Sequence, residues 1–408
     1  MTEQTKKQAE ACIERAIAEH EVAGASLLVI KDGKEELYVE RGKADCETGR
    51  DYRRDTIVRL YSATKPITSV AAMILMERGL LDAGAWLCDY LPEYADMTCV
   101  DGANVIPCGR NILIKEVLNM TSGLAYGGDN SNAGSVAAGK VFEELDRQLY
   151  TENKITTREV ARKLSDCPLA FEPGSRWMYG TSADIMGAVV EAVTGMKFGE
   201  FLQKEIFEPL GMHDTAFYVP KEKQHRLAKV YERVETGIKE CSIKECSIRE
   251  CSMKECQTNN LAIRYTQDVP PAFESGGAGL VSTIDDYAKF AQMLLQKGSY
   301  KGKRILSERT VEYMTQAALM PWQQESMNRA WESLNGYTYG NFLRILKEPE
   351  KANMFGTKGE YGWDGWLGFY FINSPKDNLT MLLSCQRKDA GTMPLTRKLK
   401  NIVWSEFC

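Results

Sequence analysis

Both ends of the chain combine a helix pattern with two strand patterns, and this feature constrains the fold most. Near the start, an amphipathic stretch over about residues 3–19 is followed by the apolar runs 25–30 and 36–40. Between these runs lies Lys31-Asp32-Gly33-Lys34, and Asp-Gly between strand-like runs is the strongest short hairpin signal. The first 40 residues therefore predict a helix followed by a β-hairpin.

The end of the chain mirrors the start. Residues 366–372 and 379–383 predict two strands joined by a polar turn, and a last helix carries Leu395 and Leu399 on one face. Two pairs of strands, each with a helix, bury their apolar faces most simply in a single covered sheet. We therefore expect one antiparallel sheet built from both termini and flanked by the terminal helices.

The middle of the chain has the periodicity of helices separated by glycine-rich loops. The expected helices cover residues 115–119, 157–165, 182–194 and 198–206. A further helix over 284–297 follows Ser282-Thr283 and has acidic residues in its first turn, as a capped N-terminus should. The fold class is thus α+β, with an α/β lobe from about 1–80 and 275–408 and a mostly helical lobe over about 81–274.

Composition excludes several partners. The 408 residues carry a net charge of −5 without a basic block, so we expect no nucleic-acid or anionic-membrane surface. The sequence contains no run of about 18 apolar residues, so we expect no membrane span. The polar N-terminus lacks the pattern of a secretory signal, so we expect a cytoplasmic protein.

The twelve cysteines do not form a metal motif. Four of them recur every five residues in a segment over 239–256, and these are Cys241, Cys246, Cys251 and Cys256. We interpret this repeat as an expanded surface loop, with soft-metal capture or cross-linking as the alternative. Cys99 and Cys108 flank an irregular loop and could form a disulfide in an oxidising compartment. With no Cys-x-x-Cys pair and three histidines, we expect no metal and no other cofactor.

Ser62-Ala63-Thr64-Lys65 is the strongest chemical signal. It lies where an extended stretch gives way to an apolar helix. A serine and a lysine three residues apart share a helix face, so the amine can lie within hydrogen-bond reach of the hydroxyl and activate it without histidine. Pro66 fits the first turn, where its missing N–H has no partner to lose. Gly-x-Ser-x-Gly is absent, which argues against a histidine triad.

Two further segments could complete such a site. Glu172 to Ser182 forms a turn that leads into a helix and presents Tyr179, whose phenol could shuttle a proton. Gly362-Trp363-Asp364-Gly365-Trp366 leads into a strand, where glycine lets a substrate approach backbone N–H groups. Residues 275–283 form another glycine-rich turn, but it lacks the lysine of a phosphate-binding loop.

Together, these segments resemble the serine β-lactamase and penicillin-binding-protein superfamily, in the branch of class C β-lactamases, DD-peptidases and related esterases. The resemblance covers most of the chain, and its motifs are residues 62–66, 119–124, 173–179, 209–212, 276–283 and 362–365. It implies a single β-lactamase-like catalytic domain over 1–408, with the site in the cleft between the two lobes.

Carried over residue by residue, the resemblance makes Ser62 the acylated nucleophile, Lys65 its partner and Tyr179 the proton shuttle. The backbone N–H groups of Ser62 and Trp366 would form the oxyanion hole. Whether neutral Lys65 or the Tyr179 phenolate is the general base stays open. Further substrate-binding positions follow from the same motifs, and they are Tyr126, Thr181, Trp363, Asp364 and Gly365.

Two departures from the family pattern bear on the substrate. Trp363 stands where the family usually has lysine or histidine, and Thr181 stands where it has asparagine. Losing a charge-assisted contact costs about 1.5–3 kcal/mol, or one to two orders of magnitude in affinity. Trp-x-Gly is similar to the esterase and acyltransferase members. We therefore expect a serine hydrolase that acts through a Ser62 acyl-enzyme on a small ester or related acyl substrate.

Two alternatives remain. The first is a β-lactamase or D-amino-acid peptidase. The second, from another class, is a catalytically idle ligand-binding domain on the same scaffold, although an idle domain has no need of Ser62, Lys65 and Tyr179 together. The sequence does not predict the oligomeric state.

Overall fold

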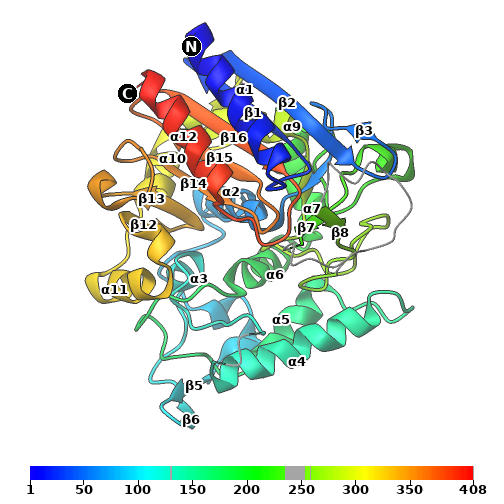
Figure 1. Cartoon of the computed structure of the whole chain (residues 1–408). Coiled ribbons are helices and arrows are strands. Elements are labelled where there is room, and N and C mark those ends of the chain that lie inside the picture. Colours follow the sequence, from blue (N-terminus) through cyan, green and yellow to red (C-terminus); the bar gives the residue numbers. More distant parts are fainter. Residues whose placement is uncertain (129–130, 235–252, 258, 408) are drawn as a thin grey trace.

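A single large sheet organises the chain (Figure 1). The computed structural model describes residues 1–128, 131–234, 253–257 and 259–407 and has an α+β, β-lactamase-like fold. The eight strands of the sheet lie in the order β12-β13-β14-β15-β16-β1-β2-β3, and all neighbours are antiparallel. Their bounds are β1 Gly24–Lys31, β2 Lys34–Asp45, β3 Arg50–Asp51, β12 Tyr337–Gly340, β13 Leu343–Leu346, β14 Tyr361–Asp364, β15 Tyr370–Ser374 and β16 Leu379–Cys385.

The predicted joining of the two termini is confirmed, because β1 and β16 pair from Ala25 opposite Cys385 to Lys31 opposite Leu379. The predicted hairpin between β1 and β2 is also present. Asp32 and Gly33 at its tip have φ angles of 52° and 73°, the left-handed conformation that a tight two-residue hairpin turn requires.

The strand predicted over 366–372 was wrong in its first half. β15 begins at Tyr370, and residues 365–369 instead form the turn that joins it to β14. Gly365 N donates to Phe369 O over 2.7 Å and Gly368 N donates to Gly365 O over 2.9 Å. Gly368 has a φ of 93°, a conformation that glycine adopts readily, so the segment turns here although its aromatic residues favour a strand.

The sheet separates two hydrophobic cores. The terminal helices α1 (Glu3–Ala18) and α12 (Pro394–Phe407) lie side by side on one face (Figure 1), where they cover Leu27, Val29 and Leu383. The other face packs on α2 (Lys65–Glu77) and α9 (Ile284–Leu295) through residues such as Leu28 and Leu382. Neighbouring residues on one strand thus face different cores, as the two-residue period of a strand dictates.

The helical lobe has α6 at its centre, in contact with α2, α3, α5 and α7. Its elements are α3 Ile114–Leu118, α4 Ala133–Gln148, α5 Thr157–Ser165, α6 Ser182–Thr194, α7 Phe198–Leu202 and α8 Glu208–Leu210, with short strands β5 Thr98–Asp101, β6 Asn104–Pro107, β7 Tyr231–Arg233 and β8 Met253–Glu255. The strands β4 (Val58–Arg59) and β9 (Val281–Ser282) form a separate two-stranded ribbon. A second ribbon, of β10 (Ser299–Tyr300) and β11 (Lys303–Arg304), follows α9.

The helices α4, α10 (Glu308–Gln316) and α11 (Pro321–Ala330) were not predicted. The helix expected over 198–206 ends its α-helical part at Leu202 and continues as a π-helical turn. Of the cysteine repeat, only the last four residues are described, and three of them form β8; the remainder lies outside the described residues. No helix in the described part of the chain is long and apolar enough to cross a membrane.

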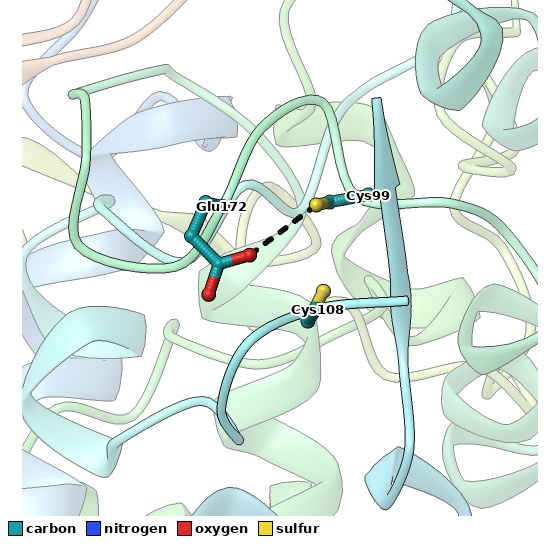
Figure 2. Close-up of side chains that lie close together, drawn as sticks. All are labelled: Cys99, Cys108 and Glu172. Atoms are coloured by element: carbon teal, nitrogen blue, oxygen red, sulfur yellow. Dashed lines mark hydrogen bonds between the residues drawn. The ribbon is translucent and has the colours of Figure 1, made fainter. Parts of the chain in front are cut away.

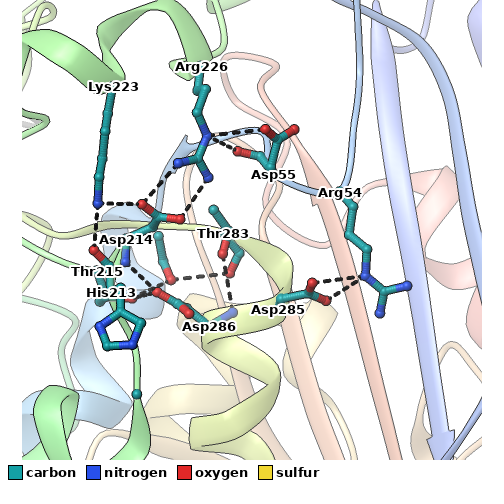
Figure 3. A network of polar contacts seen from close by, with 12 residues as sticks. Arg54, Asp55, His213, Asp214, Thr215, Lys223, Arg226, Thr283, Asp285 and Asp286 are labelled. Atoms are coloured by element: carbon teal, nitrogen blue, oxygen red, sulfur yellow. Dashed lines mark hydrogen bonds and ion pairs between the residues drawn. The ribbon is translucent and has the colours of Figure 1, made fainter.

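A polar network holds the start of α9 (Figure 3). Thr283 caps the helix, since its hydroxyl accepts from Asp286 N over 3.2 Å, as the sequence predicted. Asp286 in turn accepts from Asp214 N over 2.6 Å. Asp214 pairs with Arg226 over 2.7 Å, so the network joins α9 to the loop that follows α8. This anchors the helix whose Tyr287 hydroxyl donates to Ala63 O, one residue from Ser62.

Candidate active site

Ser62 lies at a sharp change in chain direction. Strand β4 ends at Arg59, and Tyr61 then adopts a φ of 45°, which is unusual for a bulky residue. Leu60 N donates to Leu280 O and the Tyr61 ring packs against Trp366 with 4.9 Å between centroids, so the surroundings hold this strained backbone. Ser62 lies in a 3-10 turn over Tyr61–Thr64, and α2 begins at Lys65 with Pro66 in its first turn.

Lys65 is fully buried and lies directly beside the serine. Its Nζ donates to Ser62 Oγ over 3.2 Å and to Gly277 O over 2.8 Å. Burial lowers the pKa of Lys65 to about 7, because a charged ammonium loses its hydration there, while Asp184 opposes the shift. Near neutral pH the side chain therefore exists as a mixture of amine and ammonium.

Tyr179 lies across the same site. Its ring centroid is 4.5 Å from Lys65 Nζ, and its hydroxyl accepts a hydrogen bond from Trp363 Nε1 over 3.2 Å. Burial raises the pKa of Tyr179 well above 10, with hydrogen bonding to Ser62 and Trp363 opposing the shift. The resting tyrosine is therefore a protonated phenol, which can donate a proton but cannot take one.

Asp184 is a site residue that the sequence reasoning missed. It lies in the first turn of α6, where its Oδ1 accepts from Ser275 Oγ over 2.5 Å and from Gly277 N over 3.0 Å. Its Oδ2 accepts from Tyr126 Oη over 3.2 Å. Because Gly277 O receives the bond from Lys65, Asp184 positions the loop that holds the lysine. Burial raises the pKa of this carboxyl and Lys65 opposes the shift.

The glycine-rich turn at 275–279 owes its composition to close packing. A Cβ on Gly276 would lie 2.3 Å from Ala183 O, and one on Gly277 would lie 2.6 Å from Tyr126 Oη. Both positions exclude a side chain, so the glycines bring the turn against α6. The sequence signal for Asp184 was a carboxylate in the first turn of a mostly apolar helix, three residues after Thr181.

Aromatic rings surround Tyr179. Trp363 stacks on it with 5.7 Å between centroids, and Trp331 lies 4.9 Å away. Trp331 and Trp363 are nearly parallel, at 13° and 6.2 Å. Tyr126 lies 6.0 Å from Tyr179 and also faces Lys65. Trp331, which follows α11 and is 36% exposed, was not predicted as a site residue. The site thus has an apolar, aromatic wall.

The three residues Trp363, Asp364 and Gly365 have different surroundings. Trp363 is buried and turned toward Tyr179, whereas Asp364 pairs with Arg344 over 2.7 Å and accepts from Thr392 Oγ1 over 2.8 Å. A Cβ on Gly365 would lie 2.1 Å from Leu60 O, so this glycine lets the end of β14 approach the backbone just before Ser62.

Thr181 is 1% exposed and immediately precedes α6, so its side chain lies beneath the surface of the site. Trp366 follows Gly365 in the β14–β15 turn. Neither Ser62 N nor Trp366 N donates a hydrogen bond to another described residue.

Comparison with known proteins gives a consistent result. The sequence model of the family described as Beta-lactamase matches residues 9–400. Esterase EstB of Burkholderia gladioli is 27% identical over 97% of this chain and 94% of its own length. Lovastatin esterase of Penicillium rubens is 30% identical over 77% of this chain and 72% of its own length.

Among solved structures, EstCE1, described as a hydrolase with promiscuous acyltransferase activity, has a TM-score of 0.78 at 22% identity and covers 98% of this chain and 99% of its own. That likeness concerns the fold. Because the family match spans nearly the whole sequence, this chain belongs to the beta-lactamase family.

Proposed function

We propose that this chain is a serine hydrolase of the esterase kind, with Ser62 as nucleophile, Lys65 as general base and Tyr179 as proton donor. The observation that carries the proposal is the 3.2 Å contact between Lys65 Nζ and Ser62 Oγ, made by a lysine whose burial lowers its pKa to about 7. A base with a pKa near the working pH is what general-base catalysis requires.

The proposed reaction begins with the amine form of Lys65. It takes the proton of the Ser62 hydroxyl while Oγ bonds to the acyl carbon, and the carbonyl electron pair moves onto oxygen. The N–H groups of Ser62 and Trp366 would stabilise that oxyanion. The carbonyl then re-forms, the bond to the leaving alkoxide breaks, and Tyr179 donates its proton to that oxygen while the proton on Lys65 passes to Tyr179.

Water then attacks the acyl-enzyme and gives up a proton to Lys65, after which Ser62 is released with its proton restored. An alcohol in place of water would give acyl transfer by the same steps. Because burial keeps Tyr179 protonated, Lys65 is favoured over a tyrosine phenolate as the base in the first step.

The substrate class follows from the wall around the site. Trp331 presents aromatic surface, and Trp363, which stacks on it, is buried. The guanidinium of Arg344 beside Trp363 is also buried and is paired with Asp364. Aromatic surface favours an uncharged acyl or alkyl group over a carboxylate. A neutral ester therefore suits the site better than a β-lactam, and the esterases EstB and lovastatin esterase among the relatives support this choice.

We also propose that residues 1–408 act as one catalytic unit, with the site between the sheet lobe and the helical lobe. Tyr126 and Gly365 border the reacting groups in this proposal. The cytoplasmic location stays a prediction from the sequence.

The test compares initial rates on a short-chain nitrophenyl ester and on a chromogenic cephalosporin for the wild type, Ser62→Ala and Ser69→Ala. Ser69 is a matched control, since it lies on α2, is fully buried, and its hydroxyl has no hydrogen-bond partner among the described residues. We expect ester turnover that is lost in Ser62→Ala and kept in Ser69→Ala, with little cephalosporin cleavage. Fast cephalosporin cleavage would favour a β-lactamase, and equal rates for Ser62→Ala and the wild type would refute the catalytic assignment.

A further inference from the structure

Two cysteines and a glutamate meet at the outer end of the helical lobe (Figure 2). Cys99 lies on β5, Cys108 follows β6, and Glu172 lies in the turn that leads to Tyr179. Their Sγ, Sγ and carboxylate oxygen atoms all lie within 4.8 Å of one another. Cys99 Sγ is 3.4 Å from Glu172 Oε2. Within the described residues, no second group of three such side chains comes this close.

We propose that Cys99, Cys108 and Glu172 form a binding site for one thiophilic divalent cation of the Zn²⁺ class. Two thiolates and a carboxylate are a donor set that Zn²⁺ accepts, with ligand bonds of about 2.0–2.3 Å and a tetrahedral arrangement. Atoms already within 4.8 Å of one another reach such bonds by small side-chain rotations. Three protein ligands leave the fourth position to water.

The backbone around the three side chains is built to hold them. Gly109 N donates to both carboxylate oxygens of Glu172, over 3.0 and 3.1 Å, and so fixes the orientation of that group. A Cβ at Gly109 would lie 3.3 Å from Glu172 Oε1, so glycine leaves the carboxylate its room. Cys108 N donates to Met97 O over 2.8 Å, and Leu169 N donates to Thr98 O over 2.8 Å. Oriented donors of this kind are typical of metal sites.

Metal binding at this site involves the release of protons and leaves a small net charge. The cation binds the two cysteines as thiolates, so its binding releases two thiol protons to solvent. A divalent ion, two thiolates and one carboxylate carry a net charge of −1. Arg110 pairs with Glu116 and donates to Pro173 O, and its positive charge also interacts with Glu172 and Cys108.

The consequence is a cross-link between two segments distant in sequence. The cation would tie the β5–β6 hairpin to the turn beginning at Glu172, which ends at Tyr179. The site contains none of the groups assigned to acyl transfer, so it is independent of the proposed function. Its role would be to fix this turn.

Cobalt(II) is the probe, because thiolate ligands give it a charge-transfer absorption that reports the donor atoms directly. The background is the full chain with Cys241→Ser, Cys246→Ser and Cys251→Ser, so that the repeat keeps only the thiol of Cys256. In this background we compare Cys108→Ser, Glu172→Gln and the matched control Cys88→Ser. Cys88 is a half-buried cysteine outside the cluster. The far-ultraviolet circular dichroism spectrum of each variant reports whether it has folded.

We expect one Co²⁺ per chain, displaced by Zn²⁺, with a thiolate absorption that Cys108→Ser abolishes and Cys88→Ser leaves unchanged. Glu172→Gln should weaken Co²⁺ binding by about tenfold or more. No thiolate absorption in the folded background, or an absorption that survives Cys108→Ser, would overturn the proposal. So would a Cys99–Cys108 disulfide in the isolated protein that re-forms after reduction in preference to binding Co²⁺.

Discussion

Replacing Lys65 by methionine should stabilise the protein while abolishing its chemistry, and the gain should depend on pH. The side chain is fully buried, and its pKa falls from 10.5 to about 7 on folding. At 1.36 kcal/mol per pKa unit, keeping this lysine in the site costs about 5 kcal/mol relative to an exposed one. Methionine has nearly the same stem and no charge, so it removes this cost.

The sign of the pH effect follows from proton uptake. Between about pH 7 and pH 10.5 the unfolded chain holds a proton on Lys65 that the folded chain has lost, so the free energy of unfolding of the wild type rises with pH. Methionine does not titrate. The gain in the free energy of unfolding of Lys65→Met over the wild type should therefore be about 2 kcal/mol larger at pH 7 than at pH 9. The loss of the bond to Gly277 O costs about 1–3 kcal/mol at both pH values and cancels in this difference.

Urea unfolding at pH 7 and pH 9 measures both free energies, with Lys140→Met as control because Lys140 is exposed on α4. The same proteins assayed on a nitrophenyl ester should show a loss of about 10²–10⁴ in kcat/KM for Lys65→Met alone. A stability difference between Lys65→Met and the wild type that is equal at the two pH values would refute the reasoning, since Lys65 would then not titrate near neutrality in the folded state.

Two other substitutions probe the same site. Tyr179→Phe should lower kcat on an ethyl ester by a factor of about 10²–10⁴. The loss should be far smaller on the nitrophenyl ester of the same acid, because that leaving group needs no proton. Equal losses on both esters would exclude Tyr179 as the proton donor. Asp184→Asn removes the carboxylate that raises the pKa of Lys65, so the acid limb of the pH profile of kcat/KM should move to lower pH, and a limb that stays in place or moves up would contradict the coupling.

Much of the fold could be predicted from local patterns. The Asp32-Gly33 turn, the period of the terminal helices and the capped start of α9 are signals carried within a few residues, and the structure contains all three. The start of β15 was misplaced because Gly365 to Gly368 fold back as a turn, a choice that depends on the pairing of β14 with β15. Helix α4 was missed because its first half contains Gly134 and Gly139, and glycine argues against a helix.

The sequence by itself determined the chemistry that the chain can offer, since Ser62 and Lys65 share a helical turn and Tyr179 lies in a recognisable motif. Only the tertiary structure decided how that chemistry is tuned. Burial under elements far away in sequence lowers the pKa of Lys65 to about 7. Asp184 is held in the site by a hydrogen bond from Ser275, 91 residues later along the chain. Desolvation and packing depend on what surrounds a residue in space, and no local pattern encodes that.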